Sequence, residues 1–243
     1  MHILSIFSTL VSFIFAAAVF KRWSYKKPKH LLLWGIGLVF FGIGTLTEVM
    51  LSFTFSALWL KLWYLSGAML TAAWLGQGTL YLLVRKRGVA DAFMLLLAAV
   101  SLAALVLVIS APVTSAMEGF NVTRPVSEQY KTILERNGLM VLLTILLNIY
   151  GTITLVGGAI YSSFLFWRKR VLANRMVGNL LIAAGALMPA MAGSFIKAGL
   201  VDFLYVSEFV GVTLMYAGFL QATAEQPAGK TISVPAADQP VMK

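Results

Sequence analysis

Four ionisable side chains stand at the ends of apolar stretches in this sequence, as two pairs of one acid and one base. In the first pair, Glu48 lies near the end of one apolar stretch and Lys61 near the start of the next. In the second pair, Lys197 lies near the end of a later stretch and Glu208 in the stretch that follows it. Only a few residues separate the two stretches in each case, so we expect the acid and base of each pair to meet at similar depth. Two acids and two bases placed together cost less free energy to bury than any single charge.

Glycine and aromatic side chains extend this pattern. A helix with 3.6 residues per turn places Glu48 on the same stripe as Gly44 and Gly37, so a neighbouring helix can approach closely below the carboxyl group. One hypothesis is therefore a polar pocket that opens outward. Its candidate ligand-binding residues are Glu48, Lys61, Trp63, Lys197, Tyr205 and Glu208.

Further polar residues follow helical spacing inside the apolar stretches. Thr144, Asn148 and Thr152 recur every four residues and form an intramembrane polar stripe, to which Gln77 and Asn179 add side chains nearer the opposite end. Residues of this kind also serve as hydrogen-bonding contacts between packed helices. The sequence leaves both interpretations open, a pocket lining and a packing seam.

The residue types that most enzymes need are missing from these stretches. The sequence has no cysteine, which excludes disulfides, thiolate metal sites and a cysteine nucleophile. The two histidines, His2 and His30, stand at the ends of stretches, which argues against a haem held by two histidines inside a bilayer. A retinal protein would need a lysine within its last stretch, 200–222, which has none. We therefore expect no enzymatic activity, no metal and no cofactor.

Composition predicts the elements that position these residues. Of the 243 residues, 60% are apolar and 12% are charged, whereas soluble domains have about 45–50% and about 25%. A helix crosses the ~30 Å bilayer core with about 20 mostly apolar residues. Seven stretches qualify: 2–20, 31–53, 57–84, 91–111, 138–167, 177–198 and 200–222. The sequence thus predicts an all-α polytopic membrane protein, a seven-transmembrane-helix bundle over residues 1–223.

The net charge of +10 gives the expected orientation. Twelve of the 19 Lys and Arg residues stand in the connections after the first, third and fifth stretches, whereas the connection 112–137 is neutral overall. By the positive-inside rule we expect the N-terminus outside and the C-terminus inside, in a prokaryotic plasma membrane. Basic loops attract anionic lipid, so we expect the lipid bilayer and not nucleic acid as partner. The first stretch lacks the preceding positive charge of a secretory signal and is expected to be retained.

Two segments lie outside the stretches. The connection 112–137 is predicted to contain a short helix, with Ser127 as its N-cap and Asn137-Gly138 as its stop. The tail 224–243 contains several prolines and few large apolar residues. We expect it to be a disordered cytoplasmic tail.

Residues 31–84 carry a resemblance to a known family. The relevant segments are Leu33-Trp34-Gly35, Gly42 to Glu48, and Trp59 to Gly67. This pattern resembles the seven-span N-terminal sensor region of some bacterial histidine kinases, and it covers less than a quarter of the chain. The resemblance implies a sensor. Because no kinase domain follows the last stretch, it also implies that a membrane or cytoplasmic partner protein receives the signal.

Three classes of function therefore compete. The first is a sensor-like or ligand-binding module that acts through a partner protein, and this is the class we expect. The second is a small transporter or channel, which would need a polar path that continues to the basic side. The third is a structural accessory subunit of a larger membrane complex, which would have a filled interior and an exposed apolar patch.

Overall fold

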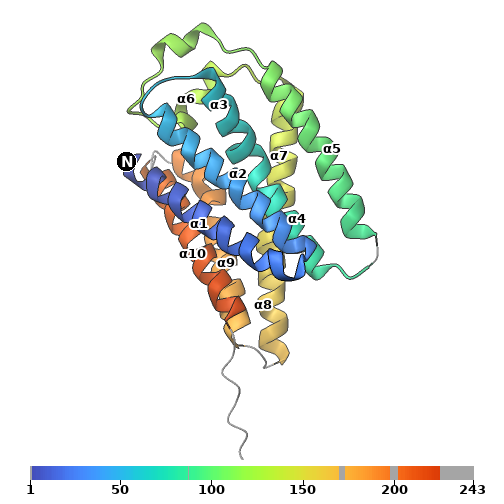
Figure 1. Ribbon diagram of the computed structural model, residues 1–243. Coiled ribbons are helices and arrows are strands. Elements are labelled where there is room, and N and C mark those ends of the chain that lie inside the picture. The colour runs from blue at the N-terminus through green and yellow to red at the C-terminus, as the bar shows by residue number, and fades with distance from the viewer. Residues whose placement is uncertain (1, 87, 170–172, 198–201, 225–243) are drawn as a thin grey trace, which may run out of the picture.

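The computed structural model describes residues 2–86, 88–169, 173–197 and 202–224, with residues 2, 173, 192–197 and 202 described by their backbone only. Figure 1 shows a bundle of long helices. The elements are α1 (His2–Lys26), α2 (Lys29–Leu51), α3 (Ala57–Leu62), η1 (Trp63–Leu70), α4 (Thr71–Leu83), α5 (Val89–Ser110), η2 (Ser115–Gly119), α6 (Val126–Ile133), α7 (Gly138–Thr152), η3 (Ile153–Gly157), α8 (Gly158–Lys169), α9 (Ala173–Lys197) and α10 (Asp202–Thr223). No strand occurs among the described residues, so the all-α prediction is confirmed.

Among the described residues, five helical segments are long and apolar enough to cross a membrane. They are Ile3–Lys26, Lys29–Leu51, Val89–Ser110, Gly138–Lys169 and Phe203–Thr223. The stretches predicted over 57–84 and 177–198 also form long helical runs, but these two are not among the five. The first of them runs through the middle of the bundle, where Lys61 and Gln77 lower its apolar content and where most of its side chains are buried by other helices.

Two of the helical runs contain π-helical turns. The run from α3 to α4 is π-helical at η1, and the run from α7 to α8 is π-helical at η3. A π-helical turn leaves a main-chain carbonyl group without its ordinary partner, and such turns occur frequently at functional sites. In η1, the Ser66 carbonyl oxygen instead accepts hydrogen bonds from the Thr71 main chain and from Thr71 Oγ1 at 2.8 Å.

Close approaches between helices hold the bundle together. A Cβ atom built on Gly44 would lie 2.9 Å from the Cα atom of Gly67, so α2 and η1 pack with main chain against main chain. In the same way a Cβ atom on Gly185 would lie 2.5 Å from the Gly211 carbonyl oxygen, between α9 and α10. Small residues at helix interfaces are typical of membrane bundles, because they allow tight van der Waals contact.

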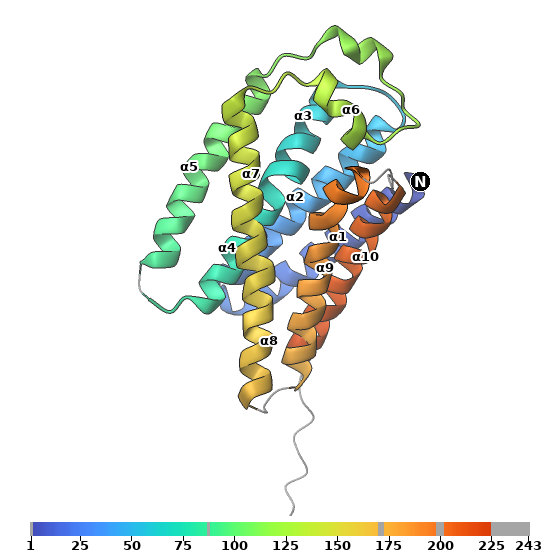
Figure 2. The ribbon, with the colours of Figure 1, turned by 180° about the vertical axis from the view of Figure 1, so that it is seen from behind.

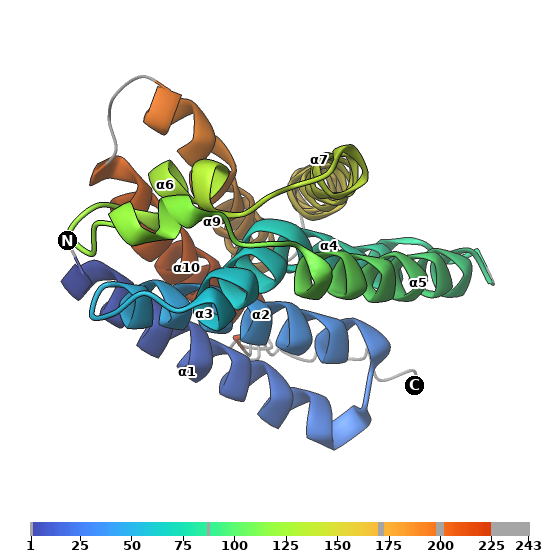
Figure 3. The ribbon, with the colours of Figure 1, turned by 90° about the horizontal axis from the view of Figure 1, so that it is seen from above.

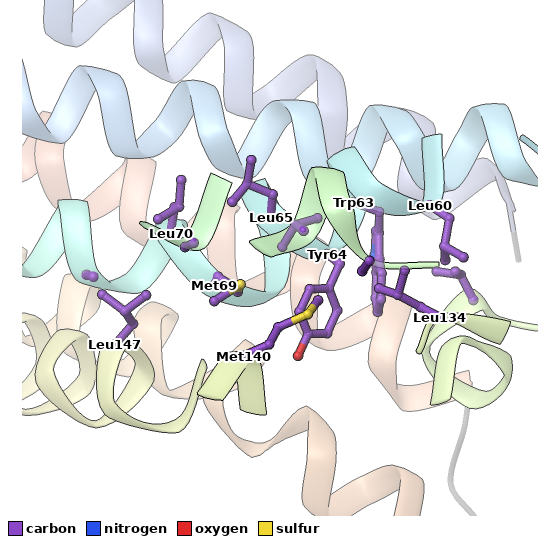
Figure 4. Close-up of a cluster of buried hydrophobic side chains, with 14 of the residues drawn as sticks. Leu60, Trp63, Tyr64, Leu65, Met69, Leu70, Leu134, Met140 and Leu147 are labelled. Atoms are coloured by element: carbon purple, nitrogen blue, oxygen red, sulfur yellow. The ribbon is translucent and has the colours of Figure 1, made fainter. Parts of the chain in front are cut away.

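Two hydrophobic clusters fill opposite ends of the bundle. Figure 4 shows part of the first, in which Tyr64 of η1 lies near Met140 of α7, and Leu134 covers the end near Trp63. The second cluster joins α1, α2, α9 and α10. At its edge the ring of Phe15 packs on that of Phe219, with centroids 5.4 Å apart.

The connection between α5 and α7 differs from its prediction at both ends of the short helix. Helix α6 begins at Val126, one residue before the expected N-cap Ser127, and it ends at Ile133. Asn137 does not stop this helix but caps the next one, because its side chain accepts a hydrogen bond of 2.8 Å from the main-chain N–H of Met140. Asparagine is among the strongest N-caps, so the same residue begins α7.

The opposite end of the bundle gathers the basic connections. Figures 1 and 2 show that α1, α4, α8 and α10 all end there. Lys29 at the start of α2 forms an ion pair of 2.6 Å with Asp91 at the start of α5. Arg22 donates a hydrogen bond to the Thr223 carbonyl oxygen at the end of α10. The tail predicted to be disordered, 224–243, lies outside the described residues except for its first residue.

Candidate functional site

A cavity of about 650 Å³ lies inside the bundle. Its walls come from α2, η1, α4, α7, η3, α9 and α10, so both π-helical segments contribute to it. Most of the lining is apolar. The polar lining residues are Thr45, Glu48, Trp63, Thr71, Asn148, Thr152 and Glu208. Ligand sites commonly combine a mostly apolar cavity of this size with a few polar groups.

Glu48 is the most strongly held of these polar residues. Its side chain is 5% exposed. Its Oε1 atom accepts a hydrogen bond of 2.9 Å from the indole N–H of Trp63, and its Oε2 atom accepts one of 3.4 Å from the Ser5 hydroxyl group. These donors compensate part of the cost of burying a carboxyl group.

The second carboxyl group, that of Glu208, reaches the first from the opposite wall. Glu48 and Glu208 line the same cavity and interact electrostatically with each other. Two carboxyl groups held close together repel each other when both are ionised, so ionisation of one disfavours ionisation of the other. Glu208 Oε2 is shielded from solvent and receives no hydrogen bond from an N–H or hydroxyl group of the described residues.

Asn148 places an amide group on the same cavity wall. Its Nδ2 atom donates to the Ala68 carbonyl oxygen in η1 at 2.7 Å and to the Thr144 carbonyl oxygen at 2.8 Å. Both amide hydrogens are thus used on main-chain acceptors, so the side-chain oxygen is the part of this cavity-lining amide that is left to accept a further hydrogen bond. Thr152, one turn further along, also lines the cavity.

The cavity opens sideways, between α7–η3 and α9. Ile149 and Ile153 line it although they are 50% and 66% exposed, and the lining residue Ala190 on α9 is exposed as well. Figure 3 shows α7 standing apart from α9 in the view from above. Further along the same run α8 does pack on α9, where Asn179 donates a hydrogen bond of 2.9 Å to Ser162.

The end of the cavity beside the connection between α5 and α7 is covered, which differs from the prediction of a pocket open at that end. Phe120, Val122 and Val126 from the connection between α5 and α7 line only a small space of about 10 Å³ next to Glu48 and Tyr205. The ring of Phe120 packs on Phe55 with centroids 5.1 Å apart. Within the described part of the chain, this connection forms a roof over the carboxyl pair.

Apolar side chains close the opposite end of the cavity. Leu38, Leu75, Leu155 and Met215 line its floor and also line the space of about 10 Å³ beyond it. The lining of that space is completed by Phe15, Trp34, Ile182 and Phe219, all of them apolar or aromatic. No polar path leads from the cavity through these described residues.

Of the predicted pocket residues, the structure brings Glu48, Trp63 and Glu208 to the cavity. Tyr205 is buried beside Glu48 under the roof. The predicted pairing of Lys61 with Glu48 is not made, because Lys61 Nζ instead donates to the Ile109 carbonyl oxygen at 2.7 Å. The side chain of Lys197 lies outside the described residues.

The residues of the predicted polar stripe also fall into two groups, those that line the cavity and those that do not. Asn148 and Thr152 line the cavity, whereas Thr144 shares a hydrogen bond of 2.9 Å with the Tyr64 hydroxyl group. Gln77 is buried and donates to the Ala90 carbonyl oxygen at 2.8 Å. Asn179 bonds to Ser162, as described above. These last three residues belong to helix packing and not to the cavity.

Sequence reasoning missed a polar face on α1. Ser5, Ser8, Thr9 and Ser12 are all buried, and Thr9 donates a hydrogen bond of 2.9 Å to Thr45 on α2. Their spacing of three and four residues is a helical signal within the first apolar stretch, and it would have indicated that this face contacts protein and not lipid.

Comparisons of this chain with protein families, with curated proteins and with solved structures gave no match. The function therefore has to be argued from the cavity itself.

Proposed function

We propose that this chain is a membrane-embedded ligand-binding module of the sensor type, which binds a small molecule in its central cavity and acts through a partner protein. The cavity with Glu48 and Glu208 in its wall is the observation that carries the proposal. Protein interiors are normally close-packed, so a purely structural bundle has no use for about 650 Å³ of unfilled space. A buried carboxyl group without a donor adds a cost that a ligand would relieve.

The proposal includes seven spans, with the N-terminus outside and the C-terminus in the cytoplasm of a prokaryotic cell. Five segments have the length and composition of spans, and the runs Ala57–Leu83 and Ala173–Lys197 would supply the other two. The basic connections gather at one end of the bundle, which the positive-inside rule assigns to the cytoplasm. Protease-sensitive tags at both termini test this: each should be cleaved from a different side. Cleavage of both tags from one side would contradict it.

The resemblance to kinase sensor regions supports the sensor class. Two of the segments that carry it, Gly42–Glu48 and Trp59–Gly67, contain the cavity-lining residues Glu48 and Trp63. The π-helical segments also support it. A π-helical turn holds more residues than an α-helical turn. If a bound ligand converted η3 to an ordinary α-helix, α8 would have to move, because it follows η3 directly. The end of α8 lies beside the basic connections, so this movement would reach that end of the bundle.

Transport is supported less well than binding. Polar groups near the basic side are few, and the two amides there, Gln77 and Asn179, are hydrogen-bonded to Ala90 and Ser162 and do not line the cavity. The floor of the cavity is apolar. A ligand that enters would therefore be held and not passed through.

The first experiment measures whether the cavity is open to small molecules. Because the sequence has no cysteine, a Thr152→Cys variant carries a single thiol at the cavity wall. Thiols react with maleimides as hydrated thiolates, so we expect N-ethylmaleimide to label Thr152→Cys in native membranes. The matched control is Ile145→Cys on α7, an exposed side chain that does not line the cavity. Equal and negligible labelling of both thiols would overturn the ligand-binding proposal.

The second experiment concerns the partner. Tagged wild-type protein and an Ala186→Phe variant, which fills the cavity, are purified from membranes in mild detergent and their bound proteins quantified. A partner whose recovery differs between the two supports sensing. Equal recovery supports the accessory-subunit class instead, and solute flux through the protein reconstituted alone supports the transporter class.

A further inference from the structure

The cavity has a polar end and an apolar end. The two carboxyl groups lie under the roof, whereas Leu38, Leu75 and Met215 form the floor. Ten residues of α2 separate Leu38 from Glu48, which corresponds to about 15 Å along a helix. A ligand that fills this space is itself amphipathic, with a polar head at Glu48 and Glu208 and an extended apolar body.

The opening faces the hydrocarbon part of the bilayer. Ile149 and Ile153 are exposed side chains within the membrane-spanning segment Gly138–Lys169, and Ala190 stands across from them on α9. The roof covers the outer end, and apolar residues close the floor. Among the described residues, the route with least obstruction therefore runs from the lipid, between α7 and α9, into the cavity. A molecule that takes this route is already dissolved in the membrane.

The polar end offers hydrogen-bond acceptors. Glu48 and Glu208 place two carboxyl groups in the cavity wall, and Glu208 Oε2 receives no donor from the described residues. The side-chain oxygen of Asn148 is a further acceptor, because both of its amide hydrogens are used elsewhere. No lysine or arginine lines the cavity in the described part of the chain. The complementary head group is therefore a donor with a single positive charge.

We propose that the cavity binds a membrane-dissolved amphipathic amine, with its ammonium head between Glu208 and Asn148 and its apolar body directed toward Leu38 and Leu75. The inference rests on the ligand-binding part of the proposed function and not on the partner. The ammonium N–H groups donate to the Glu208 carboxyl group and to the Asn148 side-chain oxygen, and the positive charge offsets negative charge on the carboxyl pair. Such charge-assisted bonds are stronger than neutral ones.

The test uses purified protein in lipid nanodiscs and four probes with the same dodecyl chain: dodecylamine, dodecyltrimethylammonium, dodecanol and dodecanoate. The readout is the shift of the thermal unfolding midpoint as each probe is titrated. We expect the largest shift from dodecylamine and none from dodecanoate. Dodecyltrimethylammonium has the charge without a donor and dodecanol has a donor without the charge, so both should be weaker than dodecylamine.

Variants separate the site from general effects of an amphiphile on the bilayer. Glu208→Gln and Asn148→Leu should each weaken dodecylamine binding roughly tenfold or more, because the first removes the negative charge that faces the ammonium group and the second removes an acceptor for it. Asp91→Asn is the matched control, since it removes a carboxyl group at the opposite end of the bundle, paired with Lys29. It should bind as the wild type does. Ala190→Trp should slow binding by narrowing the opening.

The outcomes are distinct. Equal dodecylamine shifts in wild type, Glu208→Gln and Asn148→Leu would overturn the inference, as would a dodecanoate shift as large as that of dodecylamine. If either variant fails to fold, the other still decides. Labelling of Thr152→Cys together with no dodecylamine shift would overturn the amine inference alone and leave the ligand-binding proposal standing. An unlabelled Thr152→Cys would overturn the proposed function itself.

Discussion

The Asn148 side chain donates a hydrogen bond of 2.7 Å to the carbonyl oxygen of Ala68, 80 residues earlier in the chain. Ala68 belongs to the π-helical segment η1, and Asn148 comes one turn before the π-helical segment η3. The bond therefore joins the two irregular parts of the cavity wall. It also supplies a donor to a carbonyl group within a π-helical segment, where main-chain pairing is irregular.

The first prediction concerns this bond. An Asn148→Leu substitution keeps a similar volume but leaves the Ala68 carbonyl oxygen without its side-chain donor. We expect the free energy of unfolding to fall by about 0.6–2 kcal/mol, the range for hydrogen bonds between membrane helices. Unfolding in mixed micelles measures it. The control is Leu146→Asn, the reverse exchange at an exposed position of α7, which measures the effect of introducing an amide side chain there. Unchanged stability of Asn148→Leu would show that the bond contributes nothing.

The second prediction concerns the donor to Glu48. A Trp63→Phe substitution keeps an aromatic ring but removes the indole N–H that donates to Glu48 Oε1. We expect a loss of about 1–3 kcal/mol, because a buried acceptor loses its partner. Trp59→Phe is the matched control, since Trp59 packs at the edge of the same cluster and makes no described hydrogen bond to Glu48.

A double-mutant cycle sharpens this second test. If the bond carries the effect, Trp63→Phe should cost much less in a Glu48→Leu background, which has no acceptor for the indole N–H, than in the wild type, with a coupling energy of about 0.5–3 kcal/mol. Additive costs of the two substitutions would mean that the ring and not the N–H group stabilises the protein.

The sequence alone indicated much of this arrangement. The lengths of the apolar stretches predicted helices that the structure contains, and the cost of burying charge singled out Glu48 and Glu208, which line one cavity. The pairing of Lys61 with Glu48 failed for a physical reason. The long side chain of Lys61 reaches a carbonyl group at the end of α5, and the rigid indole of Trp63, half a turn further on, faces Glu48 instead.

Other features of the site have no local signal. Neither π-helical segment follows from residue propensities, because such turns depend on which tertiary contacts accept the displaced main-chain groups. The sideways opening exists because α7 stands apart from α9 beside the cavity. That separation is set by how whole helices pack and cannot be inferred from a local segment of the sequence. The connection over the carboxyl pair was predicted to contain a short helix, and its role as a roof depends on contacts such as Phe55 with Phe120.

The third prediction concerns pH and the roof. Burial raises the pKa of the Tyr130 phenol above its ordinary value of 10.0, with the nearby Arg136 acting in the opposite direction. The folded protein therefore holds this proton more tightly than the unfolded chain does. Its contribution to stability is fully present below the unfolded pKa and is lost as the pH rises through the folded pKa.

We therefore expect a Tyr130→Phe variant to lose less stability than the wild type when the pH is raised from neutral to above about 10. Unfolding in mixed micelles at both pH values gives the two differences. Tyr161→Phe removes an exposed tyrosine of α8 and controls for general effects of alkaline conditions. Equal alkaline losses in wild type and Tyr130→Phe would rule out the predicted linkage.

The fourth prediction concerns the contact that sets the width of the cavity. A Gly44→Ala substitution would place a Cβ atom 2.9 Å from the Gly67 Cα atom, which is main chain and cannot rotate away. Helices α2 and η1 would have to separate, so we expect a loss of about 1–3 kcal/mol in the free energy of unfolding. The matched control is Gly157→Ala, because its Cβ atom would meet nothing within 4 Å. That substitution should be neutral or stabilise the helix by about 0.5–1 kcal/mol. Equal effects of the two would mean that the approach of Gly44 to Gly67 does not constrain the bundle.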